Sequence, residues 1–183
     1  MKLVGICGSL RKGSYNALAL RAAGELLPNG MSLEILDLRS IPFYDEDLRS
    51  EGEPAVVTAL KAKIRDADAV LIATPEYNFS IPGVLKNALD WLSRAPDAPF
   101  DDKVVAIMGA SPGLAGTGRV QYDLRKVMVF LNAFVVNKPE VFIREAPSKF
   151  DAQGALVDSA TREFIAELLL SVQRLARRLH SVP

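Results

Sequence analysis

The stretch KLVGICGSLRKGSYNALALRAAGELL, residues 2–27, joins three segments of different character. It begins with a short apolar run, Leu3–Cys7, of the kind that forms a strand buried on both faces. A loop of small, polar and cationic residues follows over Gly8–Asn16. From residue 17 onward the apolar side chains recur with helical spacing, which predicts a helix over Ala17–Leu27. A strand, a loop and a helix thus form the first unit of the chain.

The same order of strand and helix recurs along the rest of the chain. Four further apolar runs, the last one interrupted at residues 137–139, predict strands over Leu33–Leu38, Ala69–Ala73, Val104–Met108 and Phe134–Ile143. Helical spacing covers Ala55–Arg65, Gly83–Arg94, Arg119–Leu131 and a closing segment that contains Ile165, Leu168, Leu169, Val172, Leu175 and Leu179. The proline and acidic cluster at residues 41–54 predicts a long loop.

This alternation predicts the fold class. Right-handed crossovers between strands give a parallel sheet that is covered by helices on both faces. We therefore expect an α/β fold with a doubly wound, five-stranded parallel sheet in the strand order 2-1-3-4-5. No repeat, low-complexity segment or linker divides the chain, so residues 1–183 are expected to form a single domain.

The composition excludes several classes of protein. The 22 basic side chains equal the 22 acidic ones, so no overall positive field attracts nucleic acid or an anionic membrane. A single cysteine excludes an internal disulfide framework, and a single histidine removes most metal sites. No apolar run approaches the roughly 20 residues that span a bilayer. We expect a soluble cytoplasmic protein with no metal, no nucleic-acid partner and no membrane association.

In a sheet of this order, ligands bind beyond the carboxyl ends of the strands, at the switch point between strands 1 and 3. Three predicted loops lie there, over Gly8–Asn16, Thr74–Pro82 and Gly109–Gly118. In the first loop, Gly8 and Gly13 bracket a turn beside a helix start, whose unpaired N–H groups attract anions. Arg11 adds a forked cation that suits phosphate. The alternative is that Ser14 only caps the helix and that Arg11 and Lys12 are solvated.

Other phosphate chemistries fit this loop less well. A nucleotide-triphosphate loop requires Lys followed by Ser or Thr, where this chain has Ser14 and Tyr15. A low-molecular-weight tyrosine phosphatase attacks phosphorus with a thiolate, which would be Cys7 here, but Gly13 stands where its arginine is required. We expect Cys7 to end a buried strand as a small apolar residue.

The second loop favours a flat conjugated ring as the ligand. Pro75, Tyr77 and Phe79 supply apolar and aromatic surface, while Asn78 and backbone N–H groups can bond the polar edge of such a ring. The alternative is that Tyr77 and Phe79 only pack within the protein and that Glu76 is a solvated charge.

Together the two loops resemble a known family. GSLRKGSYN, residues 8–16, resembles the G-S-x-R-x-x-S-x-N phosphate loop of the NADPH-dependent FMN reductases. TPEYNFSIPGVLKNALDW, residues 74–91, resembles their P-E-Y-N-x-S-x-P-G-x-L-K-N-x-x-D-W/Y segment. The family includes bacterial chromate and quinone reductases. The resemblance covers nearly the whole chain and implies a flavodoxin-like fold that binds FMN. It also implies hydride transfer from NADPH or NADH, followed by reduction of quinones, chromate, azo or nitro compounds, or free flavin.

The resemblance assigns cofactor-binding residues one by one. Those in the phosphate loop are Ser9, Arg11, Ser14, Tyr15 and Asn16; those beside the isoalloxazine ring are Pro75, Glu76, Tyr77 and Asn78; Ser111 and Gly113 lie at its other edge. No catalytic side chain is implied, because flavin itself carries out hydride and electron transfer. A flavodoxin-type electron carrier without its own turnover remains the alternative, although the balanced charge gives no acidic docking face.

The helix predicted over Gly83–Arg94 has two apolar faces. Its main stripe suffices to cover the sheet and consists of Leu85, Ala88, Leu89 and Leu92. Val84 and Trp91 lie on an adjacent face, and we expect Trp91 to pack against a second copy of the chain. The alternative is one wide stripe within a monomer. The resemblance also implies a homodimer or homotetramer with flavin sites near the subunit boundary.

Overall fold

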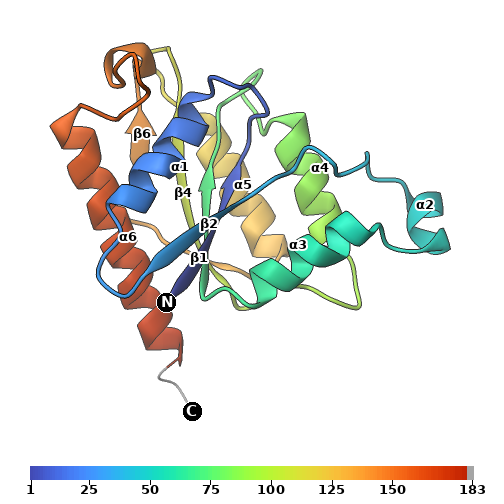
Figure 1. The fold of residues 1–183 in the computed structure, drawn as a ribbon. Coiled ribbons are helices and arrows are strands. Elements are labelled where there is room, and N and C mark those ends of the chain that lie inside the picture. The colour runs from blue at the N-terminus through green and yellow to red at the C-terminus, as the bar shows by residue number, and fades with distance from the viewer. Residues whose placement is uncertain (181–183) are drawn as a thin grey trace.

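The structure is a computed structural model that describes residues 1–180. Strands and helices alternate along most of the chain (Figure 1). The strands are β1 (Lys2–Cys7), β2 (Ser32–Leu36), β3 (Ala69–Ala73), β4 (Val104–Ala110), β5 (Phe134–Val135) and β6 (Val141–Ile143). The helices are α1 (Tyr15–Glu25), α2 (Glu46–Glu51), α3 (Ala55–Arg65), α4 (Gly83–Leu92), α5 (Gly118–Phe130) and α6 (Ser159–His180), with a short 3-10 helix at Ala146–Ser148.

All strand pairs in the sheet are parallel, and the order is β2-β1-β3-β4-β5, with β6 also paired to β4. The predicted flavodoxin-like order is therefore confirmed. The interrupted run over residues 134–143 forms two short strands rather than one. Val104, at the start of β4, pairs with Phe134, whereas Met108, near its end, pairs with Val141. Pro139 lies between β5 and β6, and proline has no N–H to donate to a ladder.

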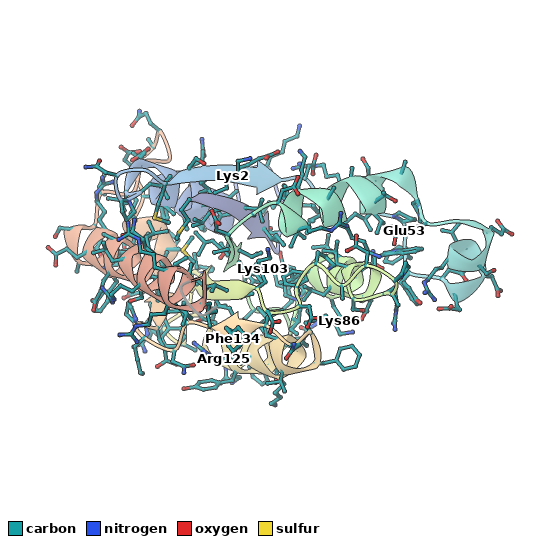
Figure 2. All side chains as sticks on the ribbon, turned by 90° about the horizontal axis from the view of Figure 1, so that it is seen from below. Lys2, Glu53, Lys86, Lys103, Arg125 and Phe134 are labelled. Carbon is teal, nitrogen blue, oxygen red and sulfur yellow. The ribbon has the colours of Figure 1, made fainter. Side chains whose placement is uncertain are left out.

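The sheet separates two layers of core. α1 and α6 cover one face, whereas α3, α4 and α5 cover the other. Figure 2 shows this arrangement from below, with α6 on the opposite side of the sheet from α3 and α4. Within β3, Leu71 packs toward α1 and α6, while Val70 and Ile72 pack toward the other layer. Because helices cover both faces, β3 and β4 are apolar and buried along their whole length.

The long loop predicted over residues 41–54 contains a helix. Its six-residue helix α2 begins after Asp45, whose carboxylate accepts a hydrogen bond from the N–H of Asp47 at 2.9 Å. No residue of α2 is buried, so apolar periodicity gave no signal for it. Among the helices within residues 1–180, none combines the length and the apolarity that crossing a membrane requires.

The expectation that Trp91 packs against a second copy is wrong, because the chain itself covers this side chain completely. Its indole Nε1–H donates to the carbonyl oxygen of Pro42 at 2.9 Å, and its ring meets that of Tyr44 edge to face. Asn87, one helical turn earlier, donates to the same carbonyl at 2.8 Å and accepts from the Tyr44 N–H at 2.7 Å. The segment that follows β2 therefore covers the second apolar face of α4.

Candidate functional site

The loops after β1, β3 and β4 meet at the carboxyl edge of the sheet. The N–H of Gly8 donates to Ala73 at 2.8 Å, and the N–H of Thr74 donates to Met108 at 3.1 Å, so the strand ladders continue into the loops. Thr74 is fully buried between two glycines, and a Cβ atom on either Gly8 or Gly109 would overlap it. The starts of the three loops are consequently held close together, as the switch-point rule predicts.

The first loop presents a cation beside the start of α1. The hydroxyl of Ser14 accepts the N–H of Ala17 at 3.4 Å and caps the helix. The Ser9 hydroxyl accepts the N–H of Arg11 at 3.4 Å and shapes the turn before it. Arg11 is exposed, and its guanidinium carbon lies 5.4 Å from the centre of the Tyr15 ring. An exposed cation, two hydroxyls and the first N–H groups of a helix form a donor set that suits a phosphate group.

Asn16 uses its whole side chain to connect α1 to β4. Its amide nitrogen donates to the carbonyl of Ala110 at 2.9 Å, and its amide oxygen accepts the Ala110 N–H at 2.8 Å. Asn16 is buried, and a buried amide without hydrogen-bond partners would cost free energy of folding; these two bonds supply the partners. Its backbone N–H belongs to the first turn of α1, where N–H groups lack acceptors within the helix. The side chain therefore positions the loop, and the backbone is the part that fits a phosphate contact.

Cys7 lies at the base of the first loop. Its thiol donates to the carbonyl of Ser9, with the sulfur and oxygen 3.3 Å apart. Burial raises the pKa of the Cys7 thiol above its ordinary value, although the hydrogen bonds to Ser9 and Ser14 act in the opposite direction. A raised pKa means that the thiol stays protonated near neutral pH, which opposes its use as a phosphatase nucleophile.

The second loop ends in a tight turn that carries an exposed aromatic ring. Tyr77 and Ser80 exchange backbone hydrogen bonds of 3.2 and 2.9 Å. Between them, Asn78 and Phe79 have φ values of 49° and 65°, the pattern of a type I′ turn. A positive φ is rare for a bulky residue such as phenylalanine. The side chains at this turn are also exposed: Phe79 is 68% exposed and Tyr77 is 50% exposed. Both therefore offer apolar surface to a ligand.

Glu76 is not the solvated charge that the alternative interpretation supposed. Its side chain is only 9% exposed. One carboxylate oxygen, Oε2, accepts the N–H groups of Arg119 and Val120 at 3.0 and 3.1 Å, and Oε1 accepts from the Arg119 guanidinium at 3.0 Å. The Arg119 guanidinium also lies over the Phe79 ring, 4.1 Å from its centre. Arg119 was missed as a site residue because 43 positions separate it from Glu76 and no local pattern connects them.

The third loop is held in place by the segment that follows β6. The N–H of Ser111 donates to Ile143, and the Ser111 carbonyl accepts from Ala146, both at 3.0 Å. The Ser111 hydroxyl accepts the N–H of Gly113 at 3.1 Å, so the two residues predicted at the second edge of the ring form one turn. Leu114 follows this turn and is 73% exposed. The loop thus has a fixed base and an apolar tip.

The chain is similar to known proteins over nearly its whole length. The family model for NADPH-dependent FMN reductases matches residues 1–148. An NAD(P)H-dependent FMN reductase of Pseudomonas aeruginosa is 52% identical over 179 residues, covering 98% of this chain and 97% of that protein. A quinone reductase of Escherichia coli is 43% identical over 182 residues, with coverage of 98% and 97%. The solved structure of a flavoenzyme NAD(P)H:(acceptor) oxidoreductase from Paracoccus denitrificans has a TM-score of 0.88 at 30% identity, with 97% of both chains covered.

Proposed function

Because the chain belongs to the NADPH-dependent FMN reductase family, we propose that it is an NAD(P)H oxidoreductase that uses bound FMN to reduce quinones. The observation that carries this proposal is the convergence of a phosphate-type loop and an aromatic turn at one edge of the sheet. The names of relatives that share 43–52% of its residues support the same activity. We further propose that the enzyme acts in the cytoplasm as one flavin-binding domain.

The donors at this edge fit FMN. The proposed phosphate contacts come from Ser9, Arg11, Ser14, Tyr15 and Asn16. The proposed ring contacts come from Pro75, the backbone of Glu76, Tyr77, Asn78, Ser111 and Gly113, since the Glu76 carboxylate is bonded to Arg119 and Val120. When bound, FMN supplies the hydride and electron transfer itself. The loops therefore have to bind the cofactor, orient its ring and leave one side open to NADPH or NADH and to the acceptor.

The acceptors that the exposed surface of the site favours are proposed to be small apolar ring compounds. Tyr77, Phe79 and Leu114 expose apolar surface on two loops of the site, and such surface favours flat conjugated molecules. Quinones have this shape, and related potato and Escherichia coli proteins are named quinone oxidoreductases or quinone reductases. Chromate, azo compounds, nitro compounds and free flavin are further proposed acceptors, since reduced flavin donates electrons to a wide range of compounds.

The proposed function predicts the result of a simple spectroscopic experiment. The purified protein, reconstituted with FMN and freed of excess, should show the visible bands of bound flavin. NADPH added without oxygen should bleach these bands rapidly, and a quinone added afterwards should restore them. Slow bleaching would instead support an electron carrier. Protein that binds no FMN under these conditions would contradict the proposal.

We also propose that the enzyme is a homodimer or homotetramer, with a contact surface between α4 and α5. Val129 and Phe130 of α5 are 79% and 76% exposed. Phe130 lines a hollow of about 350 Å³ whose apolar lining also includes Leu89, Val127 and Leu131. The rim carries both signs of charge, and Figure 2 shows one of its cations, Lys86, between α4 and α5. A surface with both signs can pair with its own copy across a two-fold axis.

Phe130→Glu should therefore shift the protein toward the monomer. A carboxylate buried in a contact between two copies, without a partner, is costly. Phe164→Glu is the matched control, because Phe164 is 52% exposed on α6, on the opposite face of the sheet. Light scattering at micromolar concentration measures the mass of the parent and of both variants. A monomeric parent with full activity, or a Phe130→Glu variant of unchanged mass, would refute the proposed contact surface.

A further inference from the structure

Glu76 connects two loops that are far apart in the sequence. It lies in the loop after β3, yet its carboxylate is bonded to the first residues of α5. On the basis of the proposed function, we propose that Glu76 is a positioning residue that keeps the loops after β3 and β4 at a fixed separation for the flavin ring. It acts through Arg119, Val120 and Phe79.

The first step of the argument is the position of the carboxylate at a helix N-terminus. The N–H groups in the first turn of a helix have no acceptors within the helix. Here the side-chain cap is absent, since Thr117 makes no capping hydrogen bond at the start of α5. Glu76 supplies the missing acceptor for Arg119 and Val120, and its negative charge also suits the positive end of the helix dipole.

This contact closes the third loop at its far end. The loop leaves the sheet at Ala110, the last residue of β4, and enters α5 at Gly118. Its near end is held by the ladder of β4 and by the bonds from Ser111 to the segment after β6. Its far end is held by Thr117, which is buried against Gly109, and by Glu76 one helical turn further on. The separation between the third loop and the second loop therefore depends in part on a side chain that belongs to the second loop.

The same carboxylate also supports the tip of the second loop. Its other oxygen pairs with Arg119, whose guanidinium lies over the ring of Phe79. Phe79 holds an unfavourable positive φ, and such a conformation persists only where surrounding contacts maintain it. Glu76 is thus connected to both proposed walls of the ring site, through a carboxylate that is 9% exposed and an Arg119 side chain that is 53% exposed.

The chemistry of this contact requires a carboxylate. Both oxygens of Glu76 accept hydrogen bonds, and an amide offers only one accepting oxygen. In Glu76→Gln, either the helix N–H groups or the Arg119 guanidinium would therefore face an NH₂ group. The substitution preserves size and shape, so its effect reports the lost acceptor and the lost charge.

The test measures the binding of FMN and riboflavin to the apoprotein by flavin fluorescence. Glu76→Gln should raise the Kd of both flavins about tenfold and leave their ratio unchanged, because it loosens the ring site and spares the phosphate site. At saturating flavin, the visible circular dichroism of bound riboflavin should decrease, since a looser site orients the ring less uniformly. Glu34→Gln is the matched control, because it makes the same change at an exposed ion pair with Lys63.

A second measurement uses the flavin-free protein. Its result does not depend on flavin binding, so it tests the role of Glu76 even if the proposed function is wrong. Hydrogen exchange at the N–H groups of Arg119 and Val120 should be faster in Glu76→Gln than in the parent and in Glu34→Gln. Unchanged exchange at both groups would overturn the inference, whether or not the parent binds flavin. Parent-like riboflavin binding and circular dichroism in Glu76→Gln would overturn it as well.

Discussion

Replacing Arg11 by alanine should weaken FMN binding about 10- to 150-fold, because the variant loses a charge-assisted hydrogen bond worth roughly 1.5–3 kcal/mol. Arg11 is exposed in the loop after β1 and lies beside Tyr15 at the start of α1. Its forked guanidinium can donate to two phosphate oxygens at once. Riboflavin lacks the phosphate, so its binding should not change. The two titrations together therefore separate a phosphate contact from a general loss of structure.

Lys12→Ala is the matched control for this prediction. Lys12 is the neighbouring exposed cation, and its removal makes the same change in net charge. A lysine that only contributes to the local field should change the Kd for FMN less than about fivefold. Flavin fluorescence measures all the dissociation constants. An Arg11→Ala variant that binds FMN as tightly as the parent would remove Arg11 from the phosphate site.

Gly109→Ala should lower the free energy of unfolding by about 1–3 kcal/mol, the usual cost of overpacking a well-packed core. Gly109 lies near the end of β4, and a Cβ atom there would overlap both the Thr74 carbonyl oxygen and the Thr117 hydroxyl. Thr74 and Thr117 are fully buried, so neither can move away without disturbing the loops that they begin or end. Affinity for FMN and for riboflavin should therefore decrease together with stability.

The control for this prediction is Gly24→Ala in α1. There the nearest atom to a new Cβ would be a Leu33 methyl carbon at 3.9 Å, which is an ordinary contact. Gly24 lies in the last turn of α1, so alanine there should stabilise the protein by at most the roughly 0.5–1 kcal/mol that separates alanine from glycine in a helix interior. Urea denaturation of the apoproteins measures both changes. A Gly109→Ala variant as stable as the parent would show that the loop bases are not closely packed.

Local patterns in the sequence were sufficient to predict the architecture. The apolar runs at residues 69–73 and 104–108 correspond to central strands, because a strand covered on both faces needs apolar residues at every position. Once strands and helices alternate, the handedness of the crossovers leaves few possible strand orders, and the predicted one is observed. The same reasoning placed the three loops at one edge. The family resemblance was also available from the sequence, since each of its motifs is a continuous segment.

What only the tertiary structure decided is which distant groups meet. Periodicity showed that Trp91 lies on an apolar face, but it could not show that Pro42 and Tyr44 of the same chain cover that face. The loop motif contained Glu76, but its partner Arg119 lies 43 positions away. Asn16 is bonded to Ala110 across 94 positions. Local sequence patterns report the period of a segment and the chemistry of its side chains, whereas the partner of each side chain depends on how the whole chain packs.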